Sequence, residues 1–384
     1  MADLQNAASA QDWEQLDGDT RYLTHSLHRY SGKFIPQIAG QAIDLISAPG
    51  ELVLDPYTGS GTSLLEAALS GRHSIGIDLN PLACVIAKVK TTPIAPERLD
   101  DFRQRLEQSV RSLNGLQLEL SGLTGTESPR LAVESDPRWT EPSFVKWFPD
   151  ERRRELVLIN QLIQTEPASD LRRVGWIAFS EILRQSSMAN TSYPNVMYDR
   201  RKTPPRSAIP RFLRRLVEVC DAVAQLHEKL PDEMTPTVLQ ASACSLPLED
   251  ESIDAIVTHP PYIGSIPYAE YGVLSLMWLG VDPRAVDAVL TGGRRQSRHV
   301  VTRFQADFAE TFHQCYRVLR RDRHLAMLLG SPTVRGERID LPAMAQELAR
   351  SCGFVLEGLV KRKGGNRRAN LMAEETLLFF RRPA

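Results

Sequence analysis

Residues 52–63 constrain the fold of this 384-residue chain more than any other stretch. The apolar run at 52–54 ends in Asp55, and a loop containing Gly59 and Gly61 then leads into a helical pattern. This order predicts a buried strand, a tight turn and a helix N-terminus. Glycine lets the backbone come close to a ligand, and the first turn of a helix offers free N–H groups to it. The stretch therefore predicts the ligand-binding part of an α/β fold.

A second carboxylate narrows the type of ligand. The strand predicted over 73–77 ends in Asp78, 23 residues after Asp55. A carboxylate at that point can accept hydrogen bonds from a ribose diol, which indicates a cofactor that contains a nucleoside. The dinucleotide fingerprint needs a third glycine where this chain has Leu64, and a phosphate-binding loop needs a lysine after Gly61, which is absent here. Both of those cofactor classes are therefore disfavoured.

The combined pattern of residues 55–62 and Gly76 to Pro81 resembles the S-adenosylmethionine-dependent methyltransferases that act on exocyclic amino groups of DNA bases. The resemblance implies S-adenosylmethionine as cofactor, S-adenosylhomocysteine as its product, and no metal. Residues 24–37 are similar to a segment that lies against the methionine end of the cofactor in some members. By this resemblance the cofactor contacts are Lys33, Phe34, Asp55, Pro56, Tyr57, Thr58, Gly59, Ser60, Gly61, Thr62, Asp78, Leu79, Asn80 and Ser242, with His28 and Tyr30 as further candidates.

A second motif, His259-Pro260-Pro261-Tyr262, predicts the catalytic centre. It follows a β-branched strand at 253–258, the point where ligands of open α/β sheets bind. It resembles the catalytic tetrapeptide of the family, which usually begins with Asp, Asn or Ser. The resemblance implies that the first side chain and the carbonyl of Pro260 accept the two N–H groups of the target amine. Tyr262 would stack on a base rotated out of the duplex.

His259 departs from the family pattern, and this departure bears on activity. A neutral imidazole can accept one hydrogen bond, whereas a protonated imidazole has only donors. Activity should therefore fall as the pH drops through the pKa of His259. The departure leaves open a second reading, a protein that binds S-adenosylmethionine and DNA without transferring a methyl group.

The distribution of charge predicts where DNA binds. The chain has a net charge of only −1, yet residues 151–230 carry +5 and residues 284–338 carry +6. Basic regions in an otherwise acidic chain suit phosphate contacts, although solvated helix faces would look the same. Aromatic residues interleaved with cations suit stacking and phosphate binding. The predicted contacts to DNA are Tyr193, Tyr198, Arg200, Arg201 and Arg206 in one loop and Arg294, Arg295 and Arg298 in another.

The order of predicted elements gives an α/β fold with a seven-stranded, mostly parallel methyltransferase (Rossmann-like) sheet and a largely helical insertion. Strands are predicted over 52–54, 73–77, 238–241, 253–258, 324–329, 354–361 and 376–381. Helices are predicted over 99–120, 143–165, 169–186, 210–230 and 268–279. We therefore divide the chain into residues 1–96, with the lead-in and the cofactor half; 97–235, the insertion and candidate target-recognition domain; and 236–384, the catalytic half.

These observations predict a site-specific methyltransferase that modifies N4 of cytosine in double-stranded DNA. The segment 30–37 and the order of the parts favour cytosine, and N6 of adenine is the alternative. Five scattered cysteines without C-x-x-C spacing disfavour a zinc site or disulfide framework and fit a reducing cytoplasm. The sequence has no apolar run long enough to span a bilayer. A monomer or weak dimer is expected, and a cognate restriction endonuclease is a candidate partner.

Overall fold

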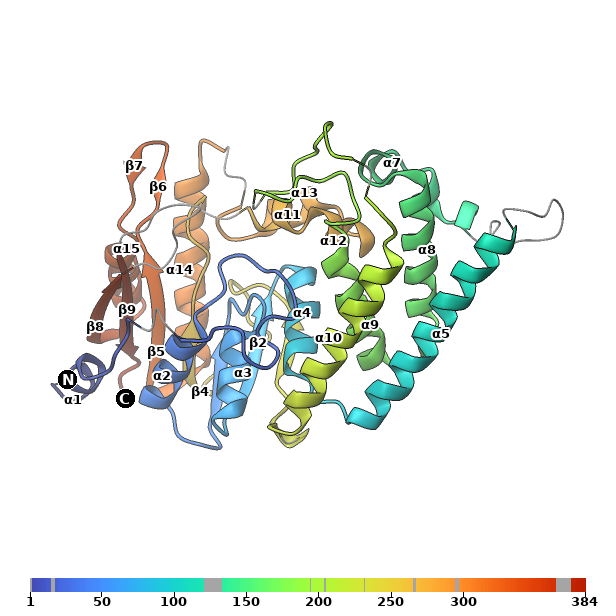
Figure 1. Ribbon diagram of the computed structural model, residues 1–384. Coiled ribbons are helices and arrows are strands. Elements are labelled where there is room, and N and C mark those ends of the chain that lie inside the picture. The colour runs from blue at the N-terminus through green and yellow to red at the C-terminus, as the bar shows by residue number, and fades with distance from the viewer. Residues whose placement is uncertain are drawn as a thin grey trace.

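A seven-stranded sheet runs through the molecule, as the ribbon diagram of the computed structural model shows (Figure 1). The structure describes residues 2–14, 18–120, 133–193, 195–203, 205–230, 232–264, 267–293, 297–363 and 374–384. The strands of the sheet are β1 (Leu52–Asp55), β2 (His73–Asp78), β3 (Thr237–Gln240), β4 (Ile253–Thr258), β5 (Leu319–Gly330), β8 (Val355–Lys363) and β9 (Glu374–Arg381). Their order in space is β3-β2-β1-β4-β5-β9-β8.

Only β9 runs antiparallel to its neighbours in this sheet; every other adjacent pair of strands is parallel. The predicted fold class, a seven-stranded and mostly parallel sheet, is thereby confirmed. A short hairpin of β6 (Thr333–Val334) and β7 (Glu337–Arg338) follows β5. Because β1 is parallel to both β2 and β4, all three strands end at the same edge of the sheet. Ligands of such sheets bind at this edge.

Alternate residues of the central strands face two different hydrophobic cores, because successive side chains on a strand point to opposite faces. Leu54 and Ile256 pack with α14 (Val300–Val318) and α15 (Leu341–Ser351). Val53 and Ala255 pack with α2 (Pro36–Ile46) on the other face. The remaining helices near the sheet are α1 (Ala2–Ser9), α3 (Thr62–Leu69) and α4 (Pro81–Thr91).

The helix α4, which follows β2, begins where its sequence predicts. Pro81 occupies the first helical turn, where its missing N–H costs nothing, and the side chain of Asn80 accepts a hydrogen bond from Leu82 N at 3.1 Å. The turn between β2 and α4 is therefore fixed by local hydrogen bonding, and it holds Asp78 at the edge of the sheet.

The region between α4 and β3 consists of helices in its described part (Figure 1). They are α5 (Pro96–Leu120), η1 (Pro137–Trp139), α7 (Pro142–Trp147), α8 (Asp150–Gln164), α9 (Ser169–Ile182), α10 (Ile209–His227) and η2 (Asp232–Met234). Three short helices that follow β4 lie against this region: α11 (Tyr268–Tyr271), α12 (Val273–Trp278) and α13 (Pro283–Val289).

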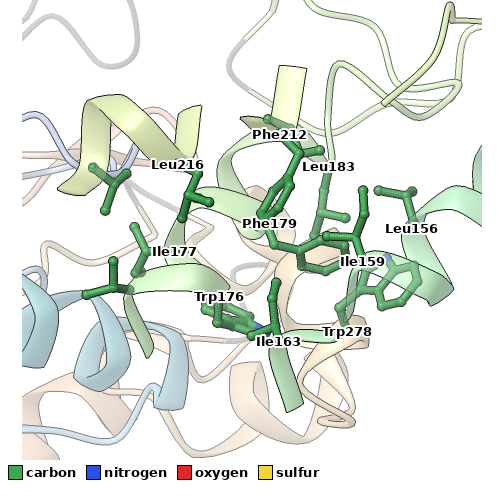
Figure 2. Close-up of a cluster of buried hydrophobic side chains, with 14 of the residues drawn as sticks. Leu156, Ile159, Ile163, Trp176, Ile177, Phe179, Leu183, Phe212, Leu216 and Trp278 are labelled. Carbon is green, nitrogen blue, oxygen red and sulfur yellow. The ribbon is translucent and has the colours of Figure 1, made fainter. Parts of the chain in front are cut away.

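One continuous hydrophobic core joins these helices to the rest of the fold (Figure 2). Trp278 of α12 lies at the centre of an aromatic group, with ring centroids 4.9 Å from Phe179, 5.2 Å from Phe144 and 5.8 Å from Phe148. Ile86 of α4 belongs to the same cluster. The helical region therefore shares its core with α4 and α12.

Candidate functional site

A cavity opens where β1, β2 and β4 end. Its lining combines the loop after β1, the turn after β2 and the start of the tetrapeptide, which lie far apart in the sequence. The lining residues are Tyr30, Gly32, Lys33, Phe34, Asp55, Pro56, Tyr57, Thr58, Gly59, Ser60, Thr62, Ser63, Asp78, Leu79, Asn80, Ala243, His259, Pro261, Tyr268, Leu290 and Thr291. All predicted cofactor contacts except Gly61 and Ser242 are among them.

The glycine loop after β1 is held close to α4. Gly61 has φ +80, and a Cβ at this position would lie 2.9 Å from the Cβ of Ala87 on α4. Gly59 also has a positive φ of 49, and a Cβ there would lie 3.3 Å from the ring of Tyr30. Gly61 therefore lets the loop pack on α4 beneath the cavity, whereas Gly59 lines the cavity itself.

Asp55 ties the loop to the neighbouring strand. Its carboxylate accepts hydrogen bonds from Tyr57 N at 3.0 Å, from Thr258 Oγ1 at 2.7 Å and from the hydroxyl of Ser63. Its side chain is buried, and this burial raises the pKa of Asp55 to about 6, against the opposing effect of the three hydrogen bonds. Asp55 therefore connects the ends of β1 and β4, where the two halves of the site meet.

Asp78 stands at the end of β2 with both carboxylate oxygens engaged by the backbone. Oδ2 accepts from Gly59 N at 2.9 Å and Oδ1 from Asn80 N at 2.8 Å. Burial raises the pKa of Asp78 to about 6. Each carboxylate oxygen has a second lone pair, so Asp78 can still accept hydrogen bonds from a hydroxyl pair in the cavity.

The tetrapeptide after β4 forms an internal hydrogen bond. His259 Nε2 lies 2.8 Å from the hydroxyl of Tyr262, while His259 Nδ1 is buried without a hydrogen-bond partner among the described residues. His259 and Pro261 line the cavity, whereas Tyr262 is 8% exposed and packs in the core beneath it. Burial lowers the pKa of His259, opposed by Glu375 and assisted by Arg362. The imidazole is therefore held in its neutral form near pH 7.

Three aromatic side chains from outside the sheet, Tyr30, Phe34 and Tyr268, also line the cavity. Tyr30 stacks on Tyr268 of α11 with ring centroids 5.8 Å apart, and the ring of Phe34 lies 5.3 Å from that of His259. His28, a further candidate, lies outside the lining, and its Nε2 is 2.9 Å from Ser180 Oγ of α9. This contact joins the segment before α2 to the helical region.

The profile of the DNA methylase family matches residues 10–89, which include the glycine loop and Asp78. Type II methyltransferase M.MvaI from Kocuria varians is 30% identical over 74% of this chain and 65% of its own length. This chain belongs to the S-adenosylmethionine-dependent DNA amino-methyltransferases. M.MjaII from Methanocaldococcus jannaschii is 23% identical over 64% of this chain and 60% of its own length. The chain thus spans less than two thirds of these curated relatives. Among solved structures, TrmN from Thermus thermophilus has a TM-score of 0.38 at 13% identity, over 94% of this chain and 52% of that one.

Among the predicted catalytic and cofactor-binding residues of this family member, four lie outside the cavity lining. Gly61 contacts α4, and Tyr262 and Pro260 are buried. The hydroxyl of Ser242 accepts a hydrogen bond from Cys244 N at 3.1 Å, and its neighbour Ala243 faces the cavity instead. Successive side chains of an extended segment point to opposite sides, so the prediction named the residue next to the one that lines the cavity.

Two lining residues that the sequence did not single out are Tyr268 and Thr291. Tyr268 begins the first helix after the tetrapeptide, so an aromatic residue shortly after Pro-Pro-Tyr was the available signal. Thr291 follows α13, and its hydroxyl lies 3.4 Å from the hydroxyl of Tyr57. Nothing in the local sequence marks Thr291, because only the tertiary fold brings it to the glycine loop.

The predicted DNA-contact loop joins α9 to α10 and lies on the same side of the molecule as α7, α11 and α13 (Figure 1). Its predicted contacts Tyr193, Tyr198, Arg200, Arg201 and Arg206 are exposed, as is Arg298, whereas Arg294 and Arg295 lie outside the described residues. The ring of Tyr198 lies 5.7 Å from that of Trp147 on α7, with Lys146 above it at 6.0 Å. The loop thus presents aromatic and cationic groups together.

Two further cations of this loop, Arg184 and Lys202, form hydrogen bonds to backbone carbonyls of the protein itself. The guanidinium of Arg184 donates to the carbonyls of Asn190 and Asn195, at 2.7 and 3.0 Å. The ammonium of Lys202 donates to the carbonyls of Ser187 and Ala189, at 2.7 and 2.8 Å. These bonds hold the backbone of the loop in place.

The described residues contain no group of three or more His, Cys, Asp or Glu side chains arranged to hold a metal ion. None of the described helices is long and apolar enough to cross a membrane.

Proposed function

We propose that this protein is a site-specific DNA methyltransferase that transfers the methyl group of S-adenosylmethionine to the N4 amine of cytosine in a flipped-out base. One observation carries the proposal. The glycine loop with Asp78 and the tetrapeptide, about 200 residues apart, line one cavity. A carboxylate that could bind a nucleoside and an acceptor for an amine therefore line the same cavity, as direct transfer between two bound molecules requires.

The residues around the cavity fit this cofactor. Asp78 has acceptor capacity for a ribose diol, and the aromatic rings of Tyr30, Tyr57 and Phe34 offer apolar surfaces beside it. S-adenosylmethionine supplies an electrophilic methyl group on a positively charged sulfur. The amine nitrogen would form the new bond to that carbon as the bond from carbon to sulfur breaks, and S-adenosylhomocysteine would leave. The methylated nitrogen would then lose one of its protons to solvent, which gives the neutral product.

In this proposal His259 is one of the two hydrogen-bond acceptors for the amine of the target base. Its Nδ1 is buried, has no hydrogen-bond partner in the part of the chain that the structure describes, and belongs to a side chain that lines the cavity. In the tautomer with hydrogen on Nε2, this N–H donates a hydrogen bond to the Tyr262 hydroxyl. Nδ1 then has a free lone pair and is the proposed acceptor for one N–H of the target amine. The carbonyl of Pro260 is the proposed second acceptor. Two acceptors favour a pyramidal nitrogen, whose lone pair can then face the methyl group.

The choice of cytosine over adenine rests on the resemblance of segment 30–37 and on the order of the parts. N6 of adenine is the alternative product, because the same acceptors serve both amines. The proposed partner is double-stranded DNA, contacted by Tyr193, Tyr198, Arg200, Arg201 and Arg206 of the α9–α10 loop and by Arg294, Arg295 and Arg298. We further propose a monomer or weak dimer that acts in the cytoplasm beside a cognate restriction endonuclease.

The test is modification-sensitive sequencing of DNA from a methylation-free host that expresses the chain. A matched culture expresses His259→Ala, which keeps the glycine loop intact. N4-methylcytosine in one sequence context, present with the parent and absent with the variant, is the expected result. The same pattern at adenine would replace the proposed product with N6-methyladenine. No mark at any base would refute the methyltransferase activity.

The second candidate is a protein that binds the cofactor and DNA without transfer, and His259 in place of the usual Asp, Asn or Ser motivates it. Replacing His259 by Ser or Asp separates the two. Gain of methylation from an inactive parent would favour the binding protein, whereas loss from an active parent would favour the working role of the imidazole.

A further inference from the structure

Lys90, near the end of α4, is a lysine in an environment that seldom holds one. Its side chain is among the largest fully buried ones in the described part of the chain, with 1% of the residue exposed. Its ammonium nitrogen donates to Ser60 Oγ of the glycine loop at 3.0 Å. Lysine is almost never fully buried unless it is paired with an opposite charge. The charged form of Lys90 would therefore need an anion nearby to be stable in this environment.

No carboxylate of the described residues lies within 4.0 Å of this ammonium or of Lys33. The charged and titratable groups that act on Lys90 are Lys33 and His25 of the segment before α2 and Glu66 of α3. Glu66 is already engaged, because its Oε1 lies 2.6 Å from the Tyr22 hydroxyl and 2.8 Å from His25 Nε2. Burial, together with the like charge of Lys33, lowers the pKa of Lys90 well below its ordinary value.

Ser60 connects this buried amine to the cavity. Its hydroxyl accepts from Lys90, so its single hydrogen remains available for donation. Ser60 lines the cavity, and so does Lys33, whose Nζ donates to His25 O at 2.9 Å and retains further N–H groups. Ser60 and Lys33 thus both bring N–H or O–H donors to the lining of the cavity, and Lys90 lies behind Ser60.

We propose that Lys90, acting through Ser60, completes a binding site for the α-carboxylate of the methionine part of the cofactor. This inference rests on the proposed function, which gives the cofactor. The nucleoside end of that molecule carries a ribose diol, and the methionine end carries an α-carboxylate. Asp78 can accept hydrogen bonds from the diol but repels the carboxylate, so we place the carboxylate at Ser60 and Lys33. Lys90 is a positioning residue here, because it acts on the ligand through the Ser60 hydroxyl rather than by touching it.

The test is calorimetric binding of two nucleosides to the full chain. S-adenosylhomocysteine carries the carboxylate, whereas 5′-methylthioadenosine lacks the amino-acid part. Lys90→Met keeps an unbranched side chain of similar length and removes the amine. Lys88→Met, on the same helix but only partly buried, is the matched control. Thermal unfolding of each variant reports on folding independently of binding.

We expect Lys90→Met to weaken S-adenosylhomocysteine binding about 10- to 100-fold, the range for loss of a charge-assisted hydrogen bond. It should leave 5′-methylthioadenosine binding within twofold, and Lys88→Met should change neither. The same thermal stability, or a higher one, is expected because a buried amine is removed.

Equal weakening of both nucleosides, or of neither, would overturn the carboxylate site while leaving the cofactor assignment intact. A parent chain that binds neither nucleoside would refute the cofactor itself, and with it this inference. The two failures are thus distinguishable within one set of titrations.

Discussion

The hydroxyl of Tyr262 offers the sharpest test of how His259 works. Tyr262→Phe removes one oxygen atom and keeps the aromatic ring that packs beneath the cavity. The hydrogen bond of 2.8 Å to His259 Nε2 is lost, so this ring nitrogen no longer has the Tyr262 hydroxyl as its partner. If Tyr262 served only to stack on a base, its hydroxyl would be dispensable.

The size of the effect follows from leaving a buried polar group without its partner. That costs about 1–3 kcal/mol, which corresponds to a slower methyl transfer by roughly 5- to 150-fold. The assay is single-turnover transfer of a labelled methyl group to a duplex that contains the recognition sequence. Tyr316→Phe is the control, because Tyr316 packs on Phe354 at 5.1 Å and lies outside the cavity lining.

The pH profile provides a second readout of the same pair. Burial lowers the pKa of His259, so the parent should keep its rate from pH 8 to pH 6.5 and lose it only at lower pH. Tyr262→Phe should change the height of this profile and also its midpoint, because the hydrogen bond acts on the titrating ring. A variant as fast as the parent at every pH, with unchanged thermal stability, would refute this role of the hydroxyl.

The remaining predictions concern the cofactor, the DNA and the glycine loop. Because the pKa of Asp78 is about 6, S-adenosylhomocysteine affinity should fall as the pH drops from 8 to 5. Asp78→Asn should remove this dependence and weaken binding at pH 8 roughly 10- to 100-fold, measured by calorimetry. Replacing Arg200 and Arg201 by Ala should reduce the slope of log affinity for DNA against log salt by about 2, and an unchanged slope would remove the loop from the interface. Gly61→Ala should cost more than the roughly 1–2 kcal/mol of a left-handed backbone, because its Cβ would also lie 2.9 Å from α4. Gly50→Ala, with φ +83 and open space around it, is the control in denaturant titrations, and equal losses would contradict the packing argument.

The strands could be predicted from the sequence because each is a short apolar run that ends in a turn signal. All seven predicted strands are present, and because only β9 is antiparallel in this sheet, the predicted mostly parallel arrangement is confirmed. Element ends were less accurate. The strand predicted over 324–329 is only the second half of β5, which begins at Leu319. The first half belongs to the sheet because Leu319 pairs with Ile253 of β4, and a register shift separates this pair from the next one, His324 with Ala255. Polar residues at 320–324 had hidden that first half.

The short helices after the tetrapeptide could not be predicted correctly. One helix was expected over 268–279, but α11 and α12 are separated at Gly272. Glycine disfavours a helix interior, and a Cβ at Gly272 would lie 2.7 Å from Leu82 of α4, so packing against α4 also requires glycine at the break. The helix α13 was not predicted, since its seven residues show little periodicity.

The parts of the site that a local sequence motif forms could be predicted, whereas the contacts between side chains could not. The glycine loop and Asp78 are local features, and they line the cavity. The bond between His259 and Tyr262 spans only three residues, yet the sequence indicates a flipped base for Tyr262 rather than an internal partner. Lys90 was invisible as a candidate, because a lysine near the end of a helix ordinarily reaches solvent.

The aromatic group around Trp278 has a consequence for engineering. Phe144, Phe148 and Phe179 come from the helical region, whereas Trp278 comes from the helix that follows the tetrapeptide. A helical region transplanted from a relative would therefore arrive with half of a core and expose the other half. If the α9–α10 loop contacts DNA as we propose, its exposed side chains Tyr193, Arg200 and Arg201 are the better place to alter target specificity, because they lie outside that shared interior.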